Sequence, residues 1–191
     1  MKSEVLSNTI DQFDKILAKS KSLFLAKSRD YGPSWRVLRP SSLTDQLYIK
    51  AARIRSLEQK KNQKVEDDIT GEYLALINYS LMAIIQEEYG FTEDHLDVSM
   101  DKLQHSYEQL VADTRTLLEA KNHDYGEAWR MMRVSSYTDL ILVKLLRIKQ
   151  MEANEQENLV SEGPKSNFQD IINYAVFALI KFSEEGKFPL K

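Results

Sequence analysis

The chain has 191 residues, of which 42% are hydrophobic and 29% are charged, and this composition excludes a disordered protein. Its formal net charge of −3 argues against stable nucleic-acid binding, which usually needs a basic excess, but leaves room for a local basic cluster that holds an anionic ligand. Cysteine is absent, so disulfides and thiolate metal sites are excluded.

The first predicted element is a helix over roughly residues 5–29. It opens with MKSEVLSNTIDQF, which lacks the apolar stretch of a signal peptide, and no apolar run in the chain is long enough to cross a bilayer. We therefore expect a cytoplasmic protein that makes no membrane contact. Apolar residues recur along this helix at helical spacing: Ile10, Phe13, Leu17, Leu23 and Phe24.

Two further helices complete the first half of the chain. Gly32, followed by Pro33, is typical of the left-handed residue at a helix end. The S-x-x-D spacing of Ser42 and Asp45 predicts a capping box, with the second helix starting after SSLTD. A polar loop over 58–68 then leads to a third helix over roughly 67–88.

The second half of the chain repeats the first, at a distance of 94 residues. Between Lys27–Ile54 and Lys121–Ile148, 14 of 28 positions are identical, and INYSLMAII at Ile77 later matches INYAVFALI at Ile172. The repeat predicts helices over roughly 100–123 and 167–184, another helix after a capping box at Ser136 and Asp139, and a polar loop over 153–166. Gene duplication and fusion explains such self-similarity, because two copies are too few for a solenoid. We predict an all-α, pseudo-twofold bundle of two three-helix repeats, residues 1–92 and 93–191, that share one core.

The repeated basic residues are the first candidates for function. Both charge and residue type recur, although surface ion pairs contribute only about 0–1 kcal/mol and seldom fix residue type. Two interpretations remain open, namely phosphate binding near the start of the second helix and internal ion pairs with acids such as Asp30 and Asp45. The candidate phosphate-binding residues are Lys27, Arg36, Arg39, Lys50, Arg53, Lys121, Arg130, Arg133, Lys144 and Arg147.

The repeated aromatic residues have two interpretations as well. Large rings with one polar tip usually pack between helices, but the same rings can stack on a nucleobase. The candidate base-stacking residues are Tyr31, Trp35, Tyr125 and Trp129.

The third helices supply carboxylates unevenly. When the two halves are aligned on Asn78 and Asn173, Glu72 faces an asparagine and Asp170 faces an alanine, as if each half had kept one acid of an E-x-x-D pair. Acids three apart share one helix face and suit Mg²⁺, which takes one or two carboxylates together with substrate phosphates. We therefore expect Mg²⁺ as cofactor, with Asp30, Glu72, Asp124 and Asp170 as candidate ligands. Asp67 and Asp68 are more typical of a helix N-terminus.

The segments KSRDYGPSWR and KNHDYGEAWR are each followed by a predicted helix that contains the motif INY. In these features the chain resembles the nucleotide modification associated domain family, first type. The resemblance covers nearly the whole chain, once per half, and implies a part in handling or modifying nucleotides. It brings no established catalytic residues. More distantly, the carboxylate pattern looks like that of the all-α nucleoside triphosphate pyrophosphatases, which hold Mg²⁺ with E-x-x-E and E-x-x-D helices. This chain lacks a clean E-x-x-E and divides the E-x-x-D between its halves.

We therefore expect a protein that binds a nucleotide or related phosphorylated small molecule, with Mg²⁺. If it is an enzyme, phosphoanhydride hydrolysis or modification-linked processing is the expected reaction. The alternative is a non-catalytic helical scaffold or regulatory interaction module. The sequence leaves open whether the fused pair forms a homodimer.

Overall fold

The computed structural model describes residues 2–59, 69–153 and 163–190. All regular secondary structure in these three segments is helical, as predicted. In chain order the elements are α1 (Lys2–Tyr31), the 3-10 helix η1 (Ser34–Val37), α2 (Pro40–Gln59), α3 (Ile69–Tyr89), α4 (Met100–Tyr125), the 3-10 helix η2 (Ala128–Met131), α5 (Val134–Ala153) and α6 (Gly163–Glu184).

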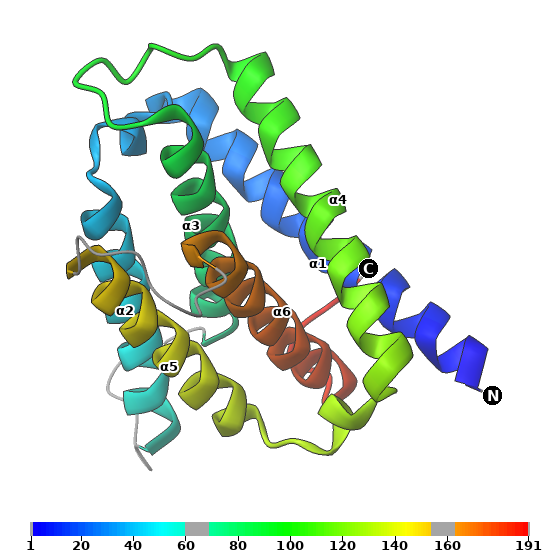
Figure 1. The fold of residues 1–191 in the computed structure, drawn as a ribbon. Helices are drawn as coiled ribbons and strands as arrows, with labels where there is room; N and C mark the ends of the chain where they lie inside the picture. Colours follow the sequence, from blue (N-terminus) through cyan, green and yellow to red (C-terminus); the bar gives the residue numbers. More distant parts are fainter. Residues whose placement is uncertain (1, 60–68, 154–162, 191) are drawn as a thin grey trace.

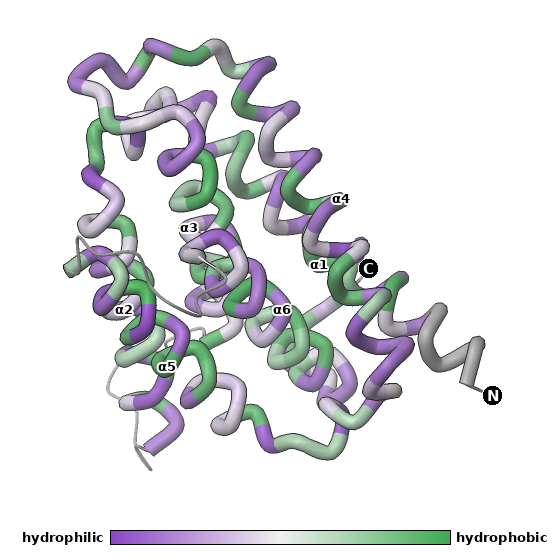
Figure 2. The backbone as a smooth tube through the Cα atoms, in the orientation of Figure 1, coloured by the Kyte–Doolittle hydropathy of each residue, from purple (hydrophilic) through white to green (hydrophobic). Residues whose placement is uncertain are grey.

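Helices α3 and α6 form the centre of the bundle (Figure 1). Helices α2 and α5 pack together on one side of them, and α1 and α4 cross on the other side. The central pair carries long buried stretches, whereas apolar and polar residues alternate along α1 and α4, as amphipathic helices require (Figure 2). Buried side chains from both halves form one continuous hydrophobic cluster. Of the apolar residues expected on α1, Leu23 is exposed.

Reciprocal contacts between α2 and α5 show the pseudo-twofold relation. Thr44 donates a hydrogen bond to Glu152 (2.6 Å), and Thr138, its counterpart 94 residues later, donates to Glu58 (2.8 Å), the counterpart of Glu152. Such an exchange, in which i contacts j and j contacts i, is the signature of a twofold interface.

The crossing of α1 and α4 repeats this pattern. Lys21 pairs with Glu108 at 2.5 Å, and their counterparts Arg115 and Asp14 pair at 3.0 Å. The repeated Asp45 also pairs across the two halves, with Lys149 at 2.5 Å. These contacts, like those between α2 and α5, confirm the predicted pseudo-twofold packing of two tandem repeats.

Both predicted glycine helix ends are confirmed. Helix α1 ends directly before Gly32 and α4 directly before Gly126, and each glycine has a φ of +64°, which residues with a side chain rarely adopt.

The predicted capping boxes are wrong. Helices α2 and α5 begin at Pro40 and Val134, so Ser42 and Ser136 are the third residues of their helices and cap nothing. Their backbone N–H groups donate to the carbonyl oxygens of Arg39 and Arg133, at 2.9 and 3.0 Å. Proline is favoured at the first helical position because no intrahelical partner exists there for an N–H, and Pro40 was therefore the stronger signal.

The third helices differ from prediction mainly at their starts. Helix α6 begins at Gly163, four residues before the expected start, and Asn167 lies inside it, donating to the carbonyl oxygen of Gly163 (2.9 Å). Helix α3 begins at Ile69. The acids at 66–68 and most of the predicted polar loops, at 60–68 and 154–162, lie outside the described residues. Among the described helices, none combines the length and apolar composition needed to span a bilayer.

Candidate functional site

Arg36, on η1, is completely buried. Its guanidinium donates to both carboxylate oxygens of Asp97 (2.7 and 3.2 Å), to the carbonyl oxygen of Gly90 (3.0 Å) and to the side-chain oxygen of Gln86. These hydrogen bonds hold the pKa of Asp97 below its ordinary value. Arg36 thus ties η1 to the end of α3 and to the α3–α4 connector, which favours the ion-pair interpretation for this residue.

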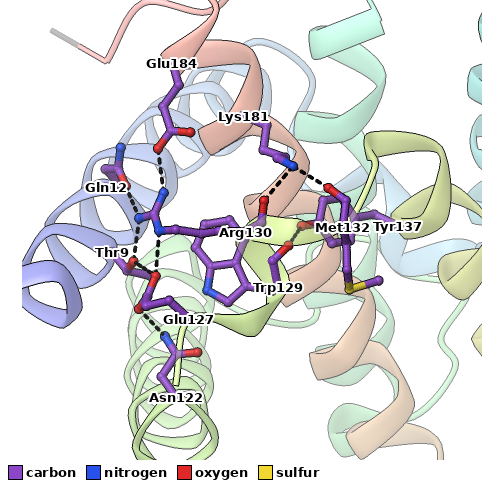
Figure 3. A network of polar contacts seen from close by, with 10 residues as sticks. All are labelled: Thr9, Gln12, Asn122, Glu127, Trp129, Arg130, Met132, Tyr137, Lys181 and Glu184. Atoms are coloured by element: carbon purple, nitrogen blue, oxygen red, sulfur yellow. Dashed lines mark hydrogen bonds and ion pairs between the residues drawn. The ribbon is translucent and has the colours of Figure 1, made fainter. Parts of the chain in front are cut away.

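Arg130, its counterpart on η2, is held in a different network (Figure 3). The guanidinium donates to Glu127 (2.7 Å), Glu184 (2.5 Å) and Thr9 (2.8 Å), which come from three different parts of the chain. Lys181 donates to the carbonyl oxygen of Arg130 (2.9 Å). Arg130 therefore also joins elements of the fold, although its side chain is 22% exposed.

Two of the repeated basic residues of the first half form ion pairs with the same glutamate. Glu72, on α3, pairs with Arg53 at 2.7 Å and with Lys50 at 3.6 Å, both on α2. The retained acid of this half therefore faces cations of the neighbouring helix.

The equivalent cluster of the second half lies around Asp170, on α6. Lys121 from α4 and Lys144 from α5 each approach one of its carboxylate oxygens at 2.6 Å. Burial acts to raise the pKa of Asp170, but the hydrogen bonds from the two lysines outweigh it and hold the pKa below its ordinary value. The cluster carries one net positive charge. Only Lys121 is well exposed, at 45% of its side chain, against 16% for Lys144.

A cleft of about 150 Å³ opens beside this cluster, between the C-terminal end of α4 and the middle of α6. Four candidates from the sequence meet in its lining, since Lys121, Tyr125, Trp129 and Asp170 all contribute to it. The complete lining is Leu118, Lys121, Asn122, Tyr125, Gly126, Trp129, Asp170, Asn173, Tyr174 and Phe177.

Two buried polar atoms of the cleft lining have no hydrogen-bond partner among the described residues. They are the indole N–H of Trp129 and the side-chain oxygen of Asn173, on residues that are 7% and 4% exposed. The indole ring stacks on Phe177, with centroids 4.2 Å apart and planes within 7°. An unpartnered buried polar group costs about 1–3 kcal/mol, so both atoms would gain from a ligand.

The cleft wall is connected to the Arg130 network. Asn122, which lines the cleft, donates to Glu127 (3.4 Å), and Glu127 in turn accepts hydrogen bonds from Arg130 and from Thr9 of α1 (Figure 3). The Arg130 guanidinium also lies over the Trp129 ring, 4.4 Å from its centroid. Arg130 therefore does not line the cleft, but it contacts Glu127 and Trp129 and so helps to hold the cleft wall in place.

The equivalent place in the first half is built differently. Asn78, the counterpart of Asn173, accepts hydrogen bonds from Ser20 (2.9 Å) and Tyr107 (3.0 Å) and donates to the Ser20 carbonyl oxygen (3.1 Å). His95 and Leu96 of the α3–α4 connector lie against Gly32, within 4 Å of a Cβ placed there, whereas no described residue lies so close to Gly126. The connector therefore covers in the first half what stays open in the second.

The other candidate residues do not join the cleft. Tyr31 is 74% exposed, and Trp35 is buried against the hydrophobic cluster. Asp124 is exposed beside His123, at 3.2 Å. A further set is exposed at the surface, away from the cleft lining: Lys27, Asp30, Arg39, Arg133 and Arg147.

The four candidate metal ligands do not gather. In the part of the chain that the structure describes, no three acidic or histidine side chains are grouped to hold a metal ion. Asp170 alone among the four lines the cleft, and two ammonium groups hold it.

Sequence reasoning missed several members of the cleft lining, among them Leu118, Asn122 and Phe177. A signal for them existed in helical spacing. Residues 118, 121, 122 and 125 follow an i, i+3, i+4, i+7 pattern on α4, and 170, 173, 174 and 177 do so on α6. Such spacing places each set on one helix face.

A comparison with family models agrees with the internal repeat. The model described as nucleotide modification associated domain 1 matches the chain twice, over residues 27–86 and 121–182. Comparisons with curated proteins and with solved structures give no significant match.

Proposed function

The chain belongs to the nucleotide modification associated domain 1 family, and from this premise we propose that the cleft of its second half binds a nucleotide or a related phosphorylated metabolite. The observation that carries the proposal is that an accessible lysine, a buried acid and two polar atoms without a partner among the described residues meet at one cleft. The description of the family supplies the class of ligand.

The phosphate is proposed to bind at Lys121. This lysine is the accessible member of the Asp170 cluster, so its ammonium group can turn toward an incoming anion while Lys144 stays on Asp170. The net positive charge of the three groups favours that exchange. Losing one charge-assisted hydrogen bond costs about 1.5–3 kcal/mol, so Lys121→Ala should weaken binding about 10- to 100-fold.

The aromatic residues of the cleft suit the other end of a nucleotide. Tyr125 is 79% exposed at the edge of the cleft, and Tyr174 and Trp129 form part of its wall. Stacking on an aromatic ring contributes about 1–3 kcal/mol per base in nucleic-acid-binding proteins. Tyr125 is the ring whose faces a base can reach without rearranging the core.

Magnesium belongs to the proposal only together with the phosphates of the ligand. Asp170 is the carboxylate of the cleft that would hold the ion, and it would have to give up at least one lysine to do so. Mg²⁺ usually takes one or two carboxylates and completes its shell with water and phosphate oxygens, which fits a single acid. There it would neutralise phosphate charge and orient water.

Hydrolysis of a phosphoanhydride is the reaction that this site would serve if it is catalytic. Water would attack one phosphorus atom and release a proton to the solvent, the bond from that phosphorus to the bridging oxygen would break, and the bridging oxygen would leave with the departing phosphate and take the electron pair and negative charge with it. Lys121 would stabilise that charge as it develops.

A thermal-shift panel tests the proposal. Ribo- and deoxynucleoside mono-, di- and triphosphates are each added with and without Mg²⁺. A ligand at 100 times its dissociation constant stabilises the protein by about 2.7 kcal/mol, which for a chain of this size raises the melting temperature by roughly 5–10 °C. We expect a selective shift that Lys121→Ala reduces and the matched variant Lys27→Ala preserves. A flat panel with folded protein would contradict the proposal.

A second function is favoured by one observation. Arg36 and Arg130, both kept in the repeat, are engaged with internal partners, as a helical scaffold or regulatory interaction module would require. Under that alternative the repeated charges serve folding alone and no nucleotide shifts the melting temperature.

A further inference from the structure

The side-chain oxygen of Asn173 is unpartnered because the two halves differ around it. In the first half, the hydroxyl groups of Ser20 and Tyr107 both donate to the equivalent oxygen of Asn78. At the corresponding positions the second half has Thr114, whose hydroxyl donates to the Leu110 carbonyl oxygen (2.7 Å), and Phe13, which has no hydroxyl.

Because of this difference, Asn78 serves the fold, whereas the side-chain oxygen of Asn173 can accept a hydrogen bond from a ligand. Asn78 joins α3 to α1 and α4 through satisfied hydrogen bonds. Asn173 keeps the same residue type and the same deep burial, yet its oxygen has no partner within the described segments. Because it lines the cleft, a ligand can supply the donor that Tyr107 supplies in the first half. The terminal torsion of an asparagine is soft, so the amide can rotate toward such a donor.

Trp129 provides the complementary group. Its indole N–H lines the same cleft and has no acceptor among the residues that the structure describes, while stacking on Phe177 fixes the plane of the ring. The indole N–H of Trp35 also lacks a partner in the described part of the chain, so this feature is common to both halves. Among the described residues, the second half combines it with an asparagine oxygen that has no partner and lines the cleft, whereas Asn78 in the first half is hydrogen-bonded through both its oxygen and its nitrogen.

The size of the cleft limits what can enter. Sites that enclose a whole drug-sized ligand measure about 300–1,000 Å³, and this cleft measures about 150 Å³. It therefore admits one ring-sized group, and the rest of the ligand stays outside, on the side of the accessible Lys121.

We propose that Asn173 and Trp129 form a subsite that reads the hydrogen-bonding edge of a nucleobase, with Asn173 accepting an N–H of the base and Trp129 donating to a ring nitrogen or carbonyl. This inference rests on the proposed function, since it assumes that Lys121 holds the phosphate. It goes further by predicting weaker binding of ligands that carry a phosphate but no base. Asn173 is accordingly a specificity-determining residue.

Titration calorimetry with paired ligands tests the subsite. The probes are the monophosphates of adenosine, guanosine, cytidine, uridine and thymidine, together with ribose 5-phosphate, which has phosphate and sugar but no base. We expect the wild-type protein to bind at least one nucleotide about tenfold or more tightly than ribose 5-phosphate, the factor that corresponds to about 1.4 kcal/mol. Asn173→Leu should bring that ratio close to one and leave the affinity for ribose 5-phosphate unchanged.

A second pair of variants guards against misfolding. Trp129→Phe removes only the N–H and keeps a ring against Phe177, and it should also lower the ratio, whereas Trp35→Phe should not. Equal affinity of the wild type for nucleotide and ribose 5-phosphate would overturn the subsite while leaving phosphate binding intact. A preserved ratio in both Asn173→Leu and Trp129→Phe would overturn it as well. If none of the probes binds, the proposed function itself fails.

Discussion

Replacing Arg36 by methionine should destabilise the protein strongly. The guanidinium is completely inaccessible, and its removal leaves Asp97, Gln86 and the carbonyl oxygen of Gly90 without their donor. Breaking a buried ion pair from one side costs about 3–5 kcal/mol. The side chain of Asp97 is 29% exposed and can recover some hydration, which places the expected loss toward the lower end, at about 3–4 kcal/mol. For a chain of this length the melting temperature should fall by roughly 6–16 °C.

Circular dichroism at 222 nm, recorded during heating, measures this loss. The matched variant is Arg130→Met, whose guanidinium is partly exposed and whose partner Glu184 is 45% exposed, so that its loss should be smaller, at about 1–3 kcal/mol. An Arg36→Met protein that melts within about 2 °C of the wild type, less than the shift expected for 1 kcal/mol, would refute the structural role of this repeated arginine.

Three further predictions concern stability. Asn78→Leu should cost about 1–3 kcal/mol, measured by urea denaturation, because it leaves buried hydroxyl groups unpaired, whereas an unchanged midpoint would contradict the hydrogen bonds described for it. Thr44→Val and Thr138→Val should both lower the melting temperature, because each hydroxyl donates to a glutamate across the twofold interface, and Thr138→Val should cost more because its hydroxyl also hydrogen-bonds the buried hydroxyl of Tyr73 (2.7 Å); an unchanged melting temperature in both variants would speak against these contacts. Glu87 is exposed by surface area, but loss of hydration among the neighbouring helices and the nearby Glu152 raise the pKa of its carboxyl group to about 7, so the folded protein retains a proton that the unfolded chain releases, and stability should fall as the pH rises from about 4.5 to about 7. Glu87→Gln should flatten this fall in melting curves recorded between about pH 5 and about pH 8, and an unaltered slope would exclude Glu87 as its source.

The internal repeat made the architecture predictable from the sequence. Copies 94 residues apart imply equivalent helices, and burying both apolar helix pairs in one core leads to a twofold arrangement. The glycine helix ends followed from backbone sterics alone, which act locally at Gly32 and Gly126. The capping boxes failed because S-x-x-D spacing also fits the first turn of a helix that has already begun, as it has at Pro40.

Local sequence patterns could not predict whether a repeated Arg or Lys side chain points into the protein or toward a cleft. Arg36 and Arg130 are identical in the repeat, yet their acidic partners, such as Asp97 and Glu184, occupy positions that do not correspond. Whether a guanidinium turns inward depends on these distant partners. The repeat therefore identified residues that matter without separating those that support the fold from those, such as Lys121, that face a cleft.

The different hydrogen bonding of Asn78 and Asn173 also depends on tertiary packing. Asn78 and Asn173 are indistinguishable in their INY motifs, and only packing shows that Tyr107 satisfies the first while Phe13 leaves the second without a donor. The sequence contained both residues, but pairing them with their asparagines required the crossing of α1 and α4.

The most direct test of nucleotide binding in the second half is the stoichiometry of binding by titration calorimetry, using the nucleotide that gives the largest thermal shift. We expect one nucleotide per chain, with affinity reduced about 10- to 100-fold in Lys121→Ala and unchanged in Lys27→Ala, because Lys121 lines the cleft, whereas in the first half His95 and Leu96 of the α3–α4 connector lie against Gly32. Two equivalent sites per chain, or equal losses in the two lysine variants, would contradict this account.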